Sequence, residues 1–355
     1  MVKIRVNTAK PYDVVIGEDI LAEAAEYIPE GEGKAVIIWD ERIPVEKVAL
    51  LGSVLEKTGK KVLALSVEAG EELKTISGFE RVVKSISDFK LTRDDVIYSV
   101  GGGTVGDVAG FIASVYKRGI KLIMVPTTIL SACDSSIGGK NALNFGKVKN
   151  LIGTFYQPSL VLVDTEFFRG LSIEAFREGC ADIIKYGFVG DKDMLKILDE
   201  RPLNEDREDL VHIENMLKRC IKLKADFVAS DEYDRGERML LNLGDTFANA
   251  IESESDFKIH HGQALAMGMV LITRACEMSG MCEKGTYDFL VSLLDRHEIE
   301  WRCPYNVRAL LDRLVEDKKV IGDSINIVIP KEIGRCVVNK VKLEELKDWF
   351  DDSKA

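Results

Sequence analysis

The stretch VIYSVGGGTVGD at residues 96–107 places a run of apolar residues directly before a cluster of glycines. A short apolar run of this kind predicts a buried strand, and the residues that follow, 104–116, predict a helix. Glycines let the backbone turn tightly and approach a phosphate, and the free N–H groups at a helix start favour its negative charge. The stretch therefore predicts a strand, a phosphate-binding turn and a helix, although a glycine cluster alone also serves packing.

Short apolar runs alternate with amphipathic stretches on both sides of this turn. The alternation is typical of a parallel sheet with helices on both faces, which is a nucleotide-binding type of fold. Pro126 closes one strand because proline has no N–H to continue the ladder. Strands are expected at 35–39, 61–65, 96–100, 122–125 and 160–164, and helices at 45–57, 76–89 and 104–116.

The second half of the chain has a different periodicity. Apolar residues recur there at spacings of three and four, as between Ile213 and Val228, which is typical of helices. The change falls near residues 165–172, where Ser172 is placed to cap a helix. We therefore predict an α/β nucleotide-binding domain at 1–168 and a mainly α-helical domain at 169–355.

Composition limits the classes of function. The 355 residues are 46% hydrophobic and 30% charged, as in globular proteins of about two domains. A net charge of −11 argues against binding to the DNA or RNA backbone. No apolar run reaches the roughly 18 residues that cross a bilayer, and residues 1–6 lack a signal-peptide core. We expect a cytoplasmic protein with no membrane or nucleic-acid partner. Its seven scattered cysteines are expected to be reduced thiols.

A second polar cluster follows the strand that Pro126 closes. It contains Arg118-Gly119, Thr127-Thr128, residues 134–140 (DSSIGGK) and Lys149-Asn150. Cationic groups beside glycines suit capture of an anion, because the backbone approaches while Lys or Arg donates charge-assisted hydrogen bonds. The alternative is a solvated loop. Asp40, after strand 35–39, suits a hydrogen bond to a ribose, or is simply a polar residue at a strand end.

Several motifs, taken in order along the chain, resemble those of the 3-dehydroquinate synthase family. The resemblance covers nearly the whole chain, and eight motifs in the family's order are far more specific than any one of them. They are GGGTVGD at 101–107, VPTTIL at 125–130, DSSIGGK at 134–140, KNLIGTF at 149–155, GCADIIKYG at 179–187, LNLGDTF at 241–247, HGQA at 261–264 and DKK at 317–319.

The resemblance implies a homodimeric carbon–oxygen lyase acting on a phosphate ester, in the shikimate pathway of aromatic amino acid biosynthesis. Such an enzyme converts the sugar phosphate 3-deoxy-D-arabino-heptulosonate 7-phosphate to 3-dehydroquinate and phosphate. Its cofactors are NAD, which takes and returns a hydride at C5, and a divalent metal, zinc or cobalt.

Family positions also imply roles for individual residues. The implied NAD contacts are Asp40, Glu71, Lys74, Gly102, Gly103, Thr104, Gly106, Asp107, Thr127, Thr128, Lys140 and Lys149. The implied substrate contacts are Arg118, which reaches the neighbouring subunit, and Asp134, Lys140, Asn150, Lys224, Arg238, Asn242, Lys318 and Lys319. The implied catalytic residues are Lys140, Lys185, Lys224, Arg238, Asn242 and Asn249.

The metal positions depart from the family, which uses one glutamate and two histidines. His261 is retained, whereas Asp182 stands at the glutamate position and Asp245 at the first histidine position. Asn249 replaces a further histidine, and an amide cannot carry a proton near pH 7. We predict a metal site of Asp182, Asp245 and His261, biased by its two carboxylates from zinc toward manganese, iron(II), cobalt or magnesium. Other candidate donors are Asn249, Glu252 and His260.

Alternatives remain for the metal site and the reaction. Asp245 after Gly244 also suits a helix cap, and His260 and His261 suit a helix entry. A related sugar-phosphate cyclase with another substrate would share most of these residues. A metal-dependent polyol or alcohol dehydrogenase would accumulate NADH, and an inactive relative would bind NAD without turnover.

Overall fold

The fold is that of a computed structural model, which describes residues 1–27, 32–146, 148–314 and 320–350. Two compact units make up the chain. The first unit contains Met1–Ser172 and Lys224–Glu232, and the second contains Ile173–Leu223 and the residues from Tyr233 onward. The segment Lys224–Glu232 thus returns to the first unit, whereas the sequence pattern suggested one continuous boundary after residue 168.

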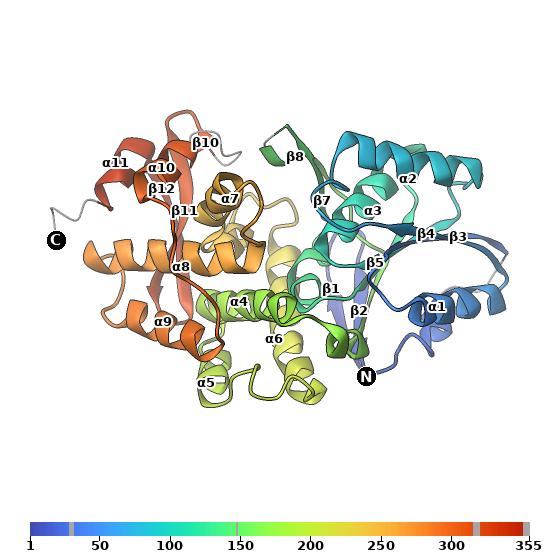
Figure 1. The fold of residues 1–355 in the computed structure, drawn as a ribbon, viewed down its shortest axis with the longest axis horizontal. Coiled ribbons are helices and arrows are strands. Elements are labelled where there is room, and N and C mark those ends of the chain that lie inside the picture. The colour runs from blue at the N-terminus through green and yellow to red at the C-terminus, as the bar shows by residue number, and fades with distance from the viewer. Residues whose placement is uncertain (28–31, 147, 315–319, 351–355) are drawn as a thin grey trace. The chain divides into compact units, whose positions relative to one another are not determined.

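A seven-stranded sheet forms the centre of the first unit (Figure 1). Its strand order is β1-β2-β9-β6-β5-β3-β4; β1 and β2 pair antiparallel and the other neighbours pair parallel. The antiparallel pair at the edge was not expected from the sequence. The strands are β1 (Val2–Val6), β2 (Tyr12–Gly17), β3 (Gly33–Asp40), β4 (Lys60–Val67), β5 (Val96–Gly101), β6 (Lys121–Pro126) and β9 (Leu160–Asp164).

Helices cover both faces of this sheet, as predicted. From β3 the chain steps through α1 (Val45–Lys57) to β4 at one edge, and then back through α2 (Ile76–Asp88) to β5 on the other side of β3. Because parallel crossovers are right-handed, a reversal of direction moves the helix to the opposite face. Figure 1 accordingly shows α1 on one side of the sheet and α2 with α3 (Gly103–Val115) on the other. The predicted α/β fold is confirmed.

A two-stranded hairpin, β7 (Lys140–Phe145) and β8 (Val148–Phe155), packs on α3. The approach is close: a Cβ on Gly110 of α3 would lie 1.7 Å from Asn141 Oδ1 of β7. The sequence pattern assigned no strands to this region. Short turns of helix complete the unit at η1 (Ala24–Glu26), η2 (Tyr116–Arg118), η3 (Ser131–Ser135) and η4 (Thr165–Gly170).

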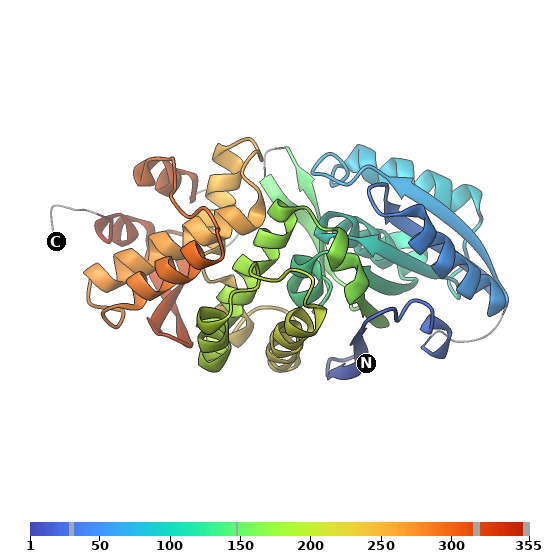
Figure 2. The same ribbon diagram turned by 60° about the horizontal axis from the view of Figure 1, so that its bottom comes forward.

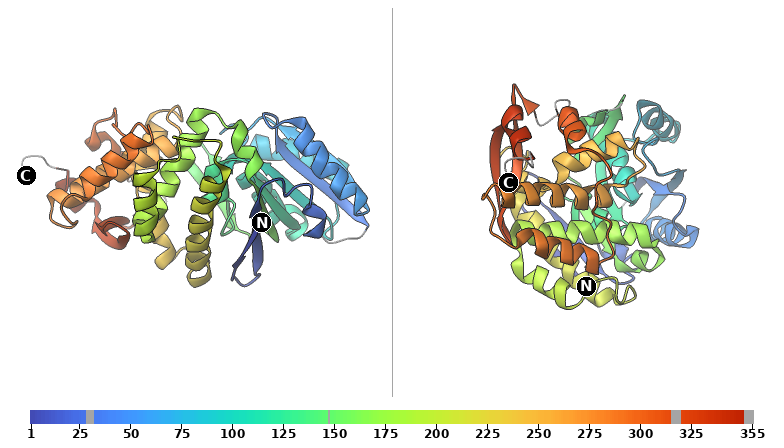
Figure 3. Two further views of the ribbon diagram at one scale, coloured as in Figure 1. Left: turned by 90° about the horizontal axis from the view of Figure 1, so that it is seen from below. Right: turned by 60° about the vertical axis from the view of Figure 1, so that its left-hand side comes forward.

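The second unit is mainly helical, as predicted, and adds a three-stranded sheet that the sequence pattern did not indicate. Helices α8 and α9 run side by side (Figures 1 and 2), and the strands stand beside the helices in Figure 3. The elements are α4 (Ile173–Gly190), α5 (Lys192–Glu200), α6 (Leu210–Ser230), η5 (Glu237–Asn242), α7 (Asp245–Glu254), α8 (His261–Met278), α9 (Thr286–Arg296), α10 (Val307–Arg313), β10 (Val320–Ile321), β11 (Ser324–Glu332), β12 (Arg335–Lys342) and α11 (Leu343–Asp348). No helix among the described residues is long and apolar enough to cross a bilayer.

Candidate functional site

The glycine-rich turn opens a pocket at the start of α3. Gly102 is the N-cap of this helix, and the turn follows β5 directly, beside the end of β6. A Cβ on Gly103 would lie 3.1 Å from Ser135 Oγ, so a larger residue there would crowd the pocket. A helix N-terminus at the carboxyl ends of parallel strands is the geometry that holds a pyrophosphate. The pocket is lined by Ser99, Gly101, Gly102, Gly106, Met124, Val125, Pro126, Ser131, Ser135 and Ser136.

Two threonines predicted to contact NAD follow β6 at this pocket. The Thr127 amide donates to Gly101 O at 3.0 Å and thereby joins the ends of β6 and β5. Thr128 Oγ1 lies 2.9 Å from Ser131 Oγ, which lines the pocket. Thr104 and Gly106 lie in the first turn of α3. The structure therefore gathers six predicted residues at one edge of the sheet: Gly102, Gly103, Thr104, Gly106, Thr127 and Thr128.

Lys74 is the centre of a buried network that joins three segments of the first unit. Its side chain is 4% exposed, and its ammonium donates to Asp107 Oδ2 at 2.6 Å and to Asn150 Oδ1. The backbone N–H of Asn150 in turn donates to Asn144 Oδ1 at 2.9 Å, and Asn144 Nδ2 donates to the Glu71 carboxylate. Asn144 was not predicted, because neither a motif nor periodicity marks it.

Asp40 lies at the end of β3, where a ribose contact was predicted. Its carboxylate instead accepts hydrogen bonds from Arg42 Nε at 3.0 Å and Arg42 Nη2 at 2.7 Å. This hydrogen bond raises the pKa of Arg42. Because Arg42 is largely exposed and Asp40 is buried, a ligand that hydrogen-bonds Asp40 has to displace or share the guanidinium.

Asp134 and Lys224, both predicted to contact substrate, form an ion pair in the first unit. The buried Lys224 ammonium contacts both the carboxylate and the backbone carbonyl of Asp134. Lys140 is exposed at the start of β7, and Lys149 lies on β8. Arg118 is exposed in η2 and has a left-handed backbone, with φ 66°.

In the second unit, Asp182 and Lys185 lie one turn apart on α4. Lys185 Nζ is 2.8 Å from Asp182 Oδ1, and the two side chains are 1% and 0% exposed. A buried charge pair is held together because removing either partner leaves the other charge in a medium that solvates it poorly. Asp182, predicted as a metal ligand, therefore already holds a cationic group.

Asp245 and His261 approach each other at the starts of α7 and α8. Gly244 precedes Asp245 with φ 82°, and a Cβ there would lie 2.6 Å from Met269 Cγ, so this turn requires glycine. Asp245 Oδ1 is 3.9 Å from His261 Nε2, and Glu252 Oε1 is 3.6 Å from His261 Nδ1. Asp245 Oδ1 is buried and accepts no hydrogen bond from any described residue.

The start of α8 also packs on the face of α4 that carries Asp182. A Cβ on Gly262 would lie 2.3 Å from Glu178 Cα, and His260 Nδ1 is 2.9 Å from Glu178 Oε1. Because residues four apart share one helix face, Glu178 and Asp182 point to the same side of α4. The start of α8 therefore packs on the face of α4 that carries Asp182.

These residues fit a divalent cation in part. An ion about 2.1 Å from each donor spans about 3.4 Å in tetrahedral geometry and at most about 4.2 Å. The 3.9 Å between Asp245 Oδ1 and His261 Nε2 falls within this range, and no described residue donates a hydrogen bond to that Asp245 oxygen. Among the described residues, no three histidine, cysteine or acidic side chains lie close enough together to bind one metal ion. The full triad with Asp182 stays a prediction.

The other predicted residues of the second unit have separate positions. Arg238 is 2% exposed in η5. Asn242, at the end of η5, donates from Nδ2 to Met239 O at 3.0 Å. Asn249 lies half-buried on α7. Lys318 and Lys319 lie outside the described residues.

His297 has a structural role. It is fully buried; its Nδ1 donates to Leu293 O at 2.8 Å, and its Nε2 accepts from the Leu203 amide at 3.3 Å. Burial lowers the pKa of His297 to about 4. The ring therefore stays neutral at physiological pH and serves the fold.

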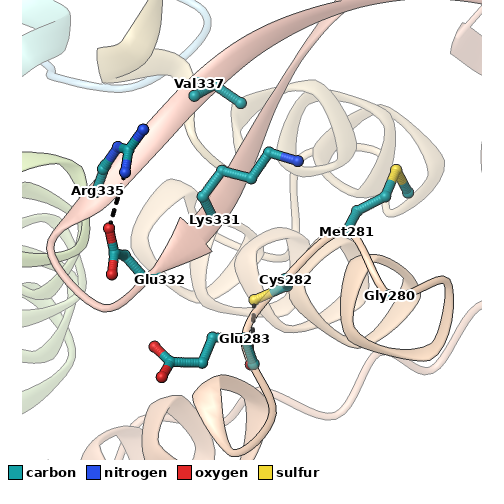
Figure 4. Close-up of a pocket in the computed structure, with 8 residues that line it drawn as sticks. All are labelled: Gly280, Met281, Cys282, Glu283, Lys331, Glu332, Arg335 and Val337. Carbon is teal, nitrogen blue, oxygen red and sulfur yellow. Dashed lines mark hydrogen bonds and ion pairs between the residues drawn. The ribbon is translucent and has the colours of Figure 1, made fainter.

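A further hollow in the second unit lies between the α8–α9 connection and the β11–β12 hairpin (Figure 4). Arg335 turns toward Glu332, 3.1 Å away, and the Cys282 thiol lies near the Glu283 carbonyl. Of the predicted site residues that the structure describes, none lines this hollow.

One unit contains a mainly parallel α/β sheet and the other is mainly helical, which is the fold of sugar-phosphate cyclases. A 2-deoxy-scyllo-inosose synthase solved with carbaglucose-6-phosphate, NAD+ and Co2+ has a TM-score of 0.88 and 23% identity, covering 98% of each chain. The 2-epi-5-epi-valiolone synthase of Streptomyces hygroscopicus, solved with NAD+ and Zn2+, has a TM-score of 0.87 and 23% identity over 95% of each chain.

The chain belongs to the 3-dehydroquinate synthase family. Family models for the N-terminal and C-terminal parts of 3-dehydroquinate synthase match residues 64–178 and 179–320. The 3-dehydroquinate synthase of Clostridium kluyveri is 37% identical over 341 residues, covering 95% of this chain and 94% of that relative. The predicted family and lyase class are thereby confirmed.

Proposed function

We propose that this chain converts 3-deoxy-D-arabino-heptulosonate 7-phosphate to 3-dehydroquinate and phosphate, with NAD and a divalent metal as cofactors. Its similarity to a named 3-dehydroquinate synthase along 95% of its length carries the proposal. The retained cations Lys224 and Arg238, buried in an acidic protein, add support because they suit a substrate with both a phosphate and a carboxylate. A simple polyol requires no such groups.

NAD is assigned to the glycine-rich turn at the start of α3. There the free N–H groups at the start of α3 receive the pyrophosphate, and the small Gly102 and Gly103 let it approach. Lys74, fixed by Asp107, supplies a positive charge on the same unit. Asp40 is assigned to the ribose, with Arg42 moving aside.

The divalent ion is assigned to Asp182, Asp245 and His261. Asp245 and His261 offer two donors 3.9 Å apart, and Asp182 joins them by exchanging its bond to Lys185 for the ion. Two carboxylates and one imidazole favour manganese, iron(II) or cobalt over zinc. When bound, NAD supplies reversible hydride transfer and the ion supplies Lewis acidity at the substrate C5 oxygen.

Binding of the ion releases Lys185 from Asp182. Lys185 and Arg238 then hold the anionic substrate in one orientation. Asn249 has no titratable proton, so it binds substrate by hydrogen bonds and another group carries the proton. His260 is one such candidate, because its imidazole is exposed and lies 2.9 Å from Glu178.

We further propose that the enzyme is a cytoplasmic homodimer. Arg118 supports the dimer: it is exposed, on a left-handed turn, and corresponds to the family position that reaches the neighbouring subunit. Light scattering coupled to size-exclusion chromatography measures the mass, and a monomer at assay concentrations would contradict the dimer.

The deciding experiment measures phosphate release from the sugar phosphate by metal-stripped protein with NAD. Zinc, cobalt, manganese, iron(II) and magnesium are added back one at a time while NADH absorbance is followed. We expect one ion to restore phosphate release with no net NADH. No release with any ion would overturn the proposal, and NADH accumulation from a polyol would show a dehydrogenase.

Each added ion is then tested on Asp245→Ala and on a matched control. Asp193→Ala serves as this control, because Asp193 is an exposed acidic residue of α5. Asp245→Ala is expected to lose release while Asp193→Ala keeps it. Equal activity of both variants would remove Asp245 from the metal site.

A further inference from the structure

The imidazole of His261 lies between two carboxylates, one at each ring nitrogen. Asp245 Oδ1 is 3.9 Å from Nε2, and Glu252 Oε1 is 3.6 Å from Nδ1. Both acidic residues lie on α7, seven positions apart, so they point to the same side of that helix two turns from each other. His261 enters from the first residue of α8, which packs along α7.

The two carboxylates differ in their surroundings. The Glu252 side chain is 4% exposed, whereas that of Asp245 is 18% exposed. A buried carboxylate attracts a nearby N–H strongly because little water competes for it. Glu252 is also the nearer of the two. At 3.6 Å the two atoms lie just beyond hydrogen-bond distance, so a small turn of either side chain would let His261 Nδ1–H donate to Glu252 and leave the lone pair of Nε2 facing Asp245.

The close packing of α7 and α8 fixes this arrangement. A Cβ on Gly268 of α8 would lie 2.3 Å from Gly244 O, so the two helices touch through backbone at this point. The start of α8 is held against α4 by the contact of Gly262 with Glu178. The backbone that carries His261 is therefore held beside α7.

We propose that Glu252 is a positioning residue that sets the tautomer and the orientation of His261, so that Nε2 presents its lone pair to a metal ion shared with Asp245. An outer carboxylate of this kind fixes the ring and increases the basicity of a ligand histidine. The inference rests on the proposed function in taking His261 as a metal ligand. In this proposal Glu252 contacts His261 and does not itself bind the ion.

The first test reads the tautomer without any metal. Long-range proton–nitrogen NMR of the metal-free full chain distinguishes a protonated ring nitrogen from an unprotonated one, and His261→Gln assigns the signal. We expect the wild-type protein at pH 8 to carry the proton on Nδ1. A proton on Nε2 would overturn the proposal, whatever the enzyme's activity.

The second test compares Glu252→Gln, whose amide oxygen can still accept from Nδ1, with Glu252→Leu, which cannot. Cobalt(II) affinity is measured by calorimetry. Glu252→Leu is expected to raise the dissociation constant about 10- to 100-fold, and Glu252→Gln by less than about tenfold. Glu254→Gln is the control, since Glu254 pairs with Arg313 at 3.0 Å instead.

The outcomes separate this inference from the proposed metal site. If His261→Gln leaves cobalt affinity unchanged, the metal site itself fails, while the tautomer spectrum still decides the role of Glu252. If His261→Gln loses cobalt binding but a folded Glu252→Leu does not weaken it, Glu252 has no positioning role. If Glu252→Leu does not fold, the NMR spectra decide. The proposal then requires the His261 proton on Nδ1 in the wild type and a larger fraction of it on Nε2 in Glu252→Gln.

Discussion

Lys185 offers the sharpest test of the buried charges on α4. Replacing it with methionine keeps most of the side-chain volume and removes the ammonium that lies 2.8 Å from Asp182 Oδ1. Because Asp182 is 0% exposed, its carboxylate loses a charged partner in surroundings with little water. Breaking a buried pair at one end costs about 3–5 kcal/mol, so we expect Lys185→Met to lose that much unfolding free energy.

Urea denaturation followed by circular dichroism, with a chelator present, measures this loss. Asp182→Asn together with Lys185→Met removes both charges and is expected to recover most of the stability. The control is Lys196→Met on α5, because Lys196 pairs with Asp193 at the same i, i+3 spacing and 2.9 Å, but both side chains are exposed. That pair is screened by water, so its removal should change little.

The same variant examines the metal assignment. A divalent cation bound by Asp182 replaces the missing ammonium, so cobalt(II) should raise the stability of Lys185→Met by more than that of the wild type. Equal stability of Lys185→Met and the wild type in the chelator would refute the reasoning, since Asp182 would then not be a buried charge held by Lys185.

Three further predictions concern other parts of the chain. Burial holds the pKa of His297 at about 4, below its unfolded value of about 6.5, so the unfolded chain binds the proton first as pH falls. About 3 kcal/mol of unfolding free energy should therefore be lost between pH 6.5 and 4. Urea titrations at several pH values measure this loss, which should be smaller in His297→Gln. Gly110→Ala places a Cβ 1.7 Å from Asn141 Oδ1 and should cost about 1–3 kcal/mol, whereas Gly52→Ala, with open space around it, should not destabilise; thermal melts that rank the two variants the other way would contradict the close packing. Lys74→Met should weaken NAD binding about tenfold or more in calorimetry, and unchanged affinity would remove Lys74 from the nucleotide site.

The centre of the first unit's sheet was largely predictable because strands such as β5 and β9 are buried on both sides. Residues 96–101 are buried at every position, and a continuous apolar run before a glycine turn has few other interpretations. The hairpin of β7 and β8 was not predictable in this way. The apolar Leu151 and Phe155 of β8 are exposed while the polar Lys149 and Asn150 are half-buried, so hydrophobicity does not follow the burial pattern and gives no strand signal.

The candidate site was predictable as a set of residue types but not as a set of contacts. Family positions placed Asp40, Lys74 and Asp182 in the site, yet each of them holds a partner within its own unit: Arg42, Asp107 and Lys185. Such pairs depend on how helices and strands pack against each other, and the spacing of residues along the chain does not predict that packing. Glu252 was named as a possible metal donor, and only the packing of α7 against α8 places it behind His261 instead.

The return of Lys224–Glu232 to the first unit has a consequence for synthesis of the chain. A ribosome that has completed Met1–Ser172 has made the whole parallel sheet, but it has not yet made the Lys224 ammonium that pairs with Asp134. The first unit is thus finished only after Ile173–Leu223 of the second has been translated, and α6 is the helix that delivers the missing piece. A fragment cut after Ser172 would therefore lack part of the first unit. The ion pair of Asp134 and Lys224 can form only after both segments of that unit have left the ribosome.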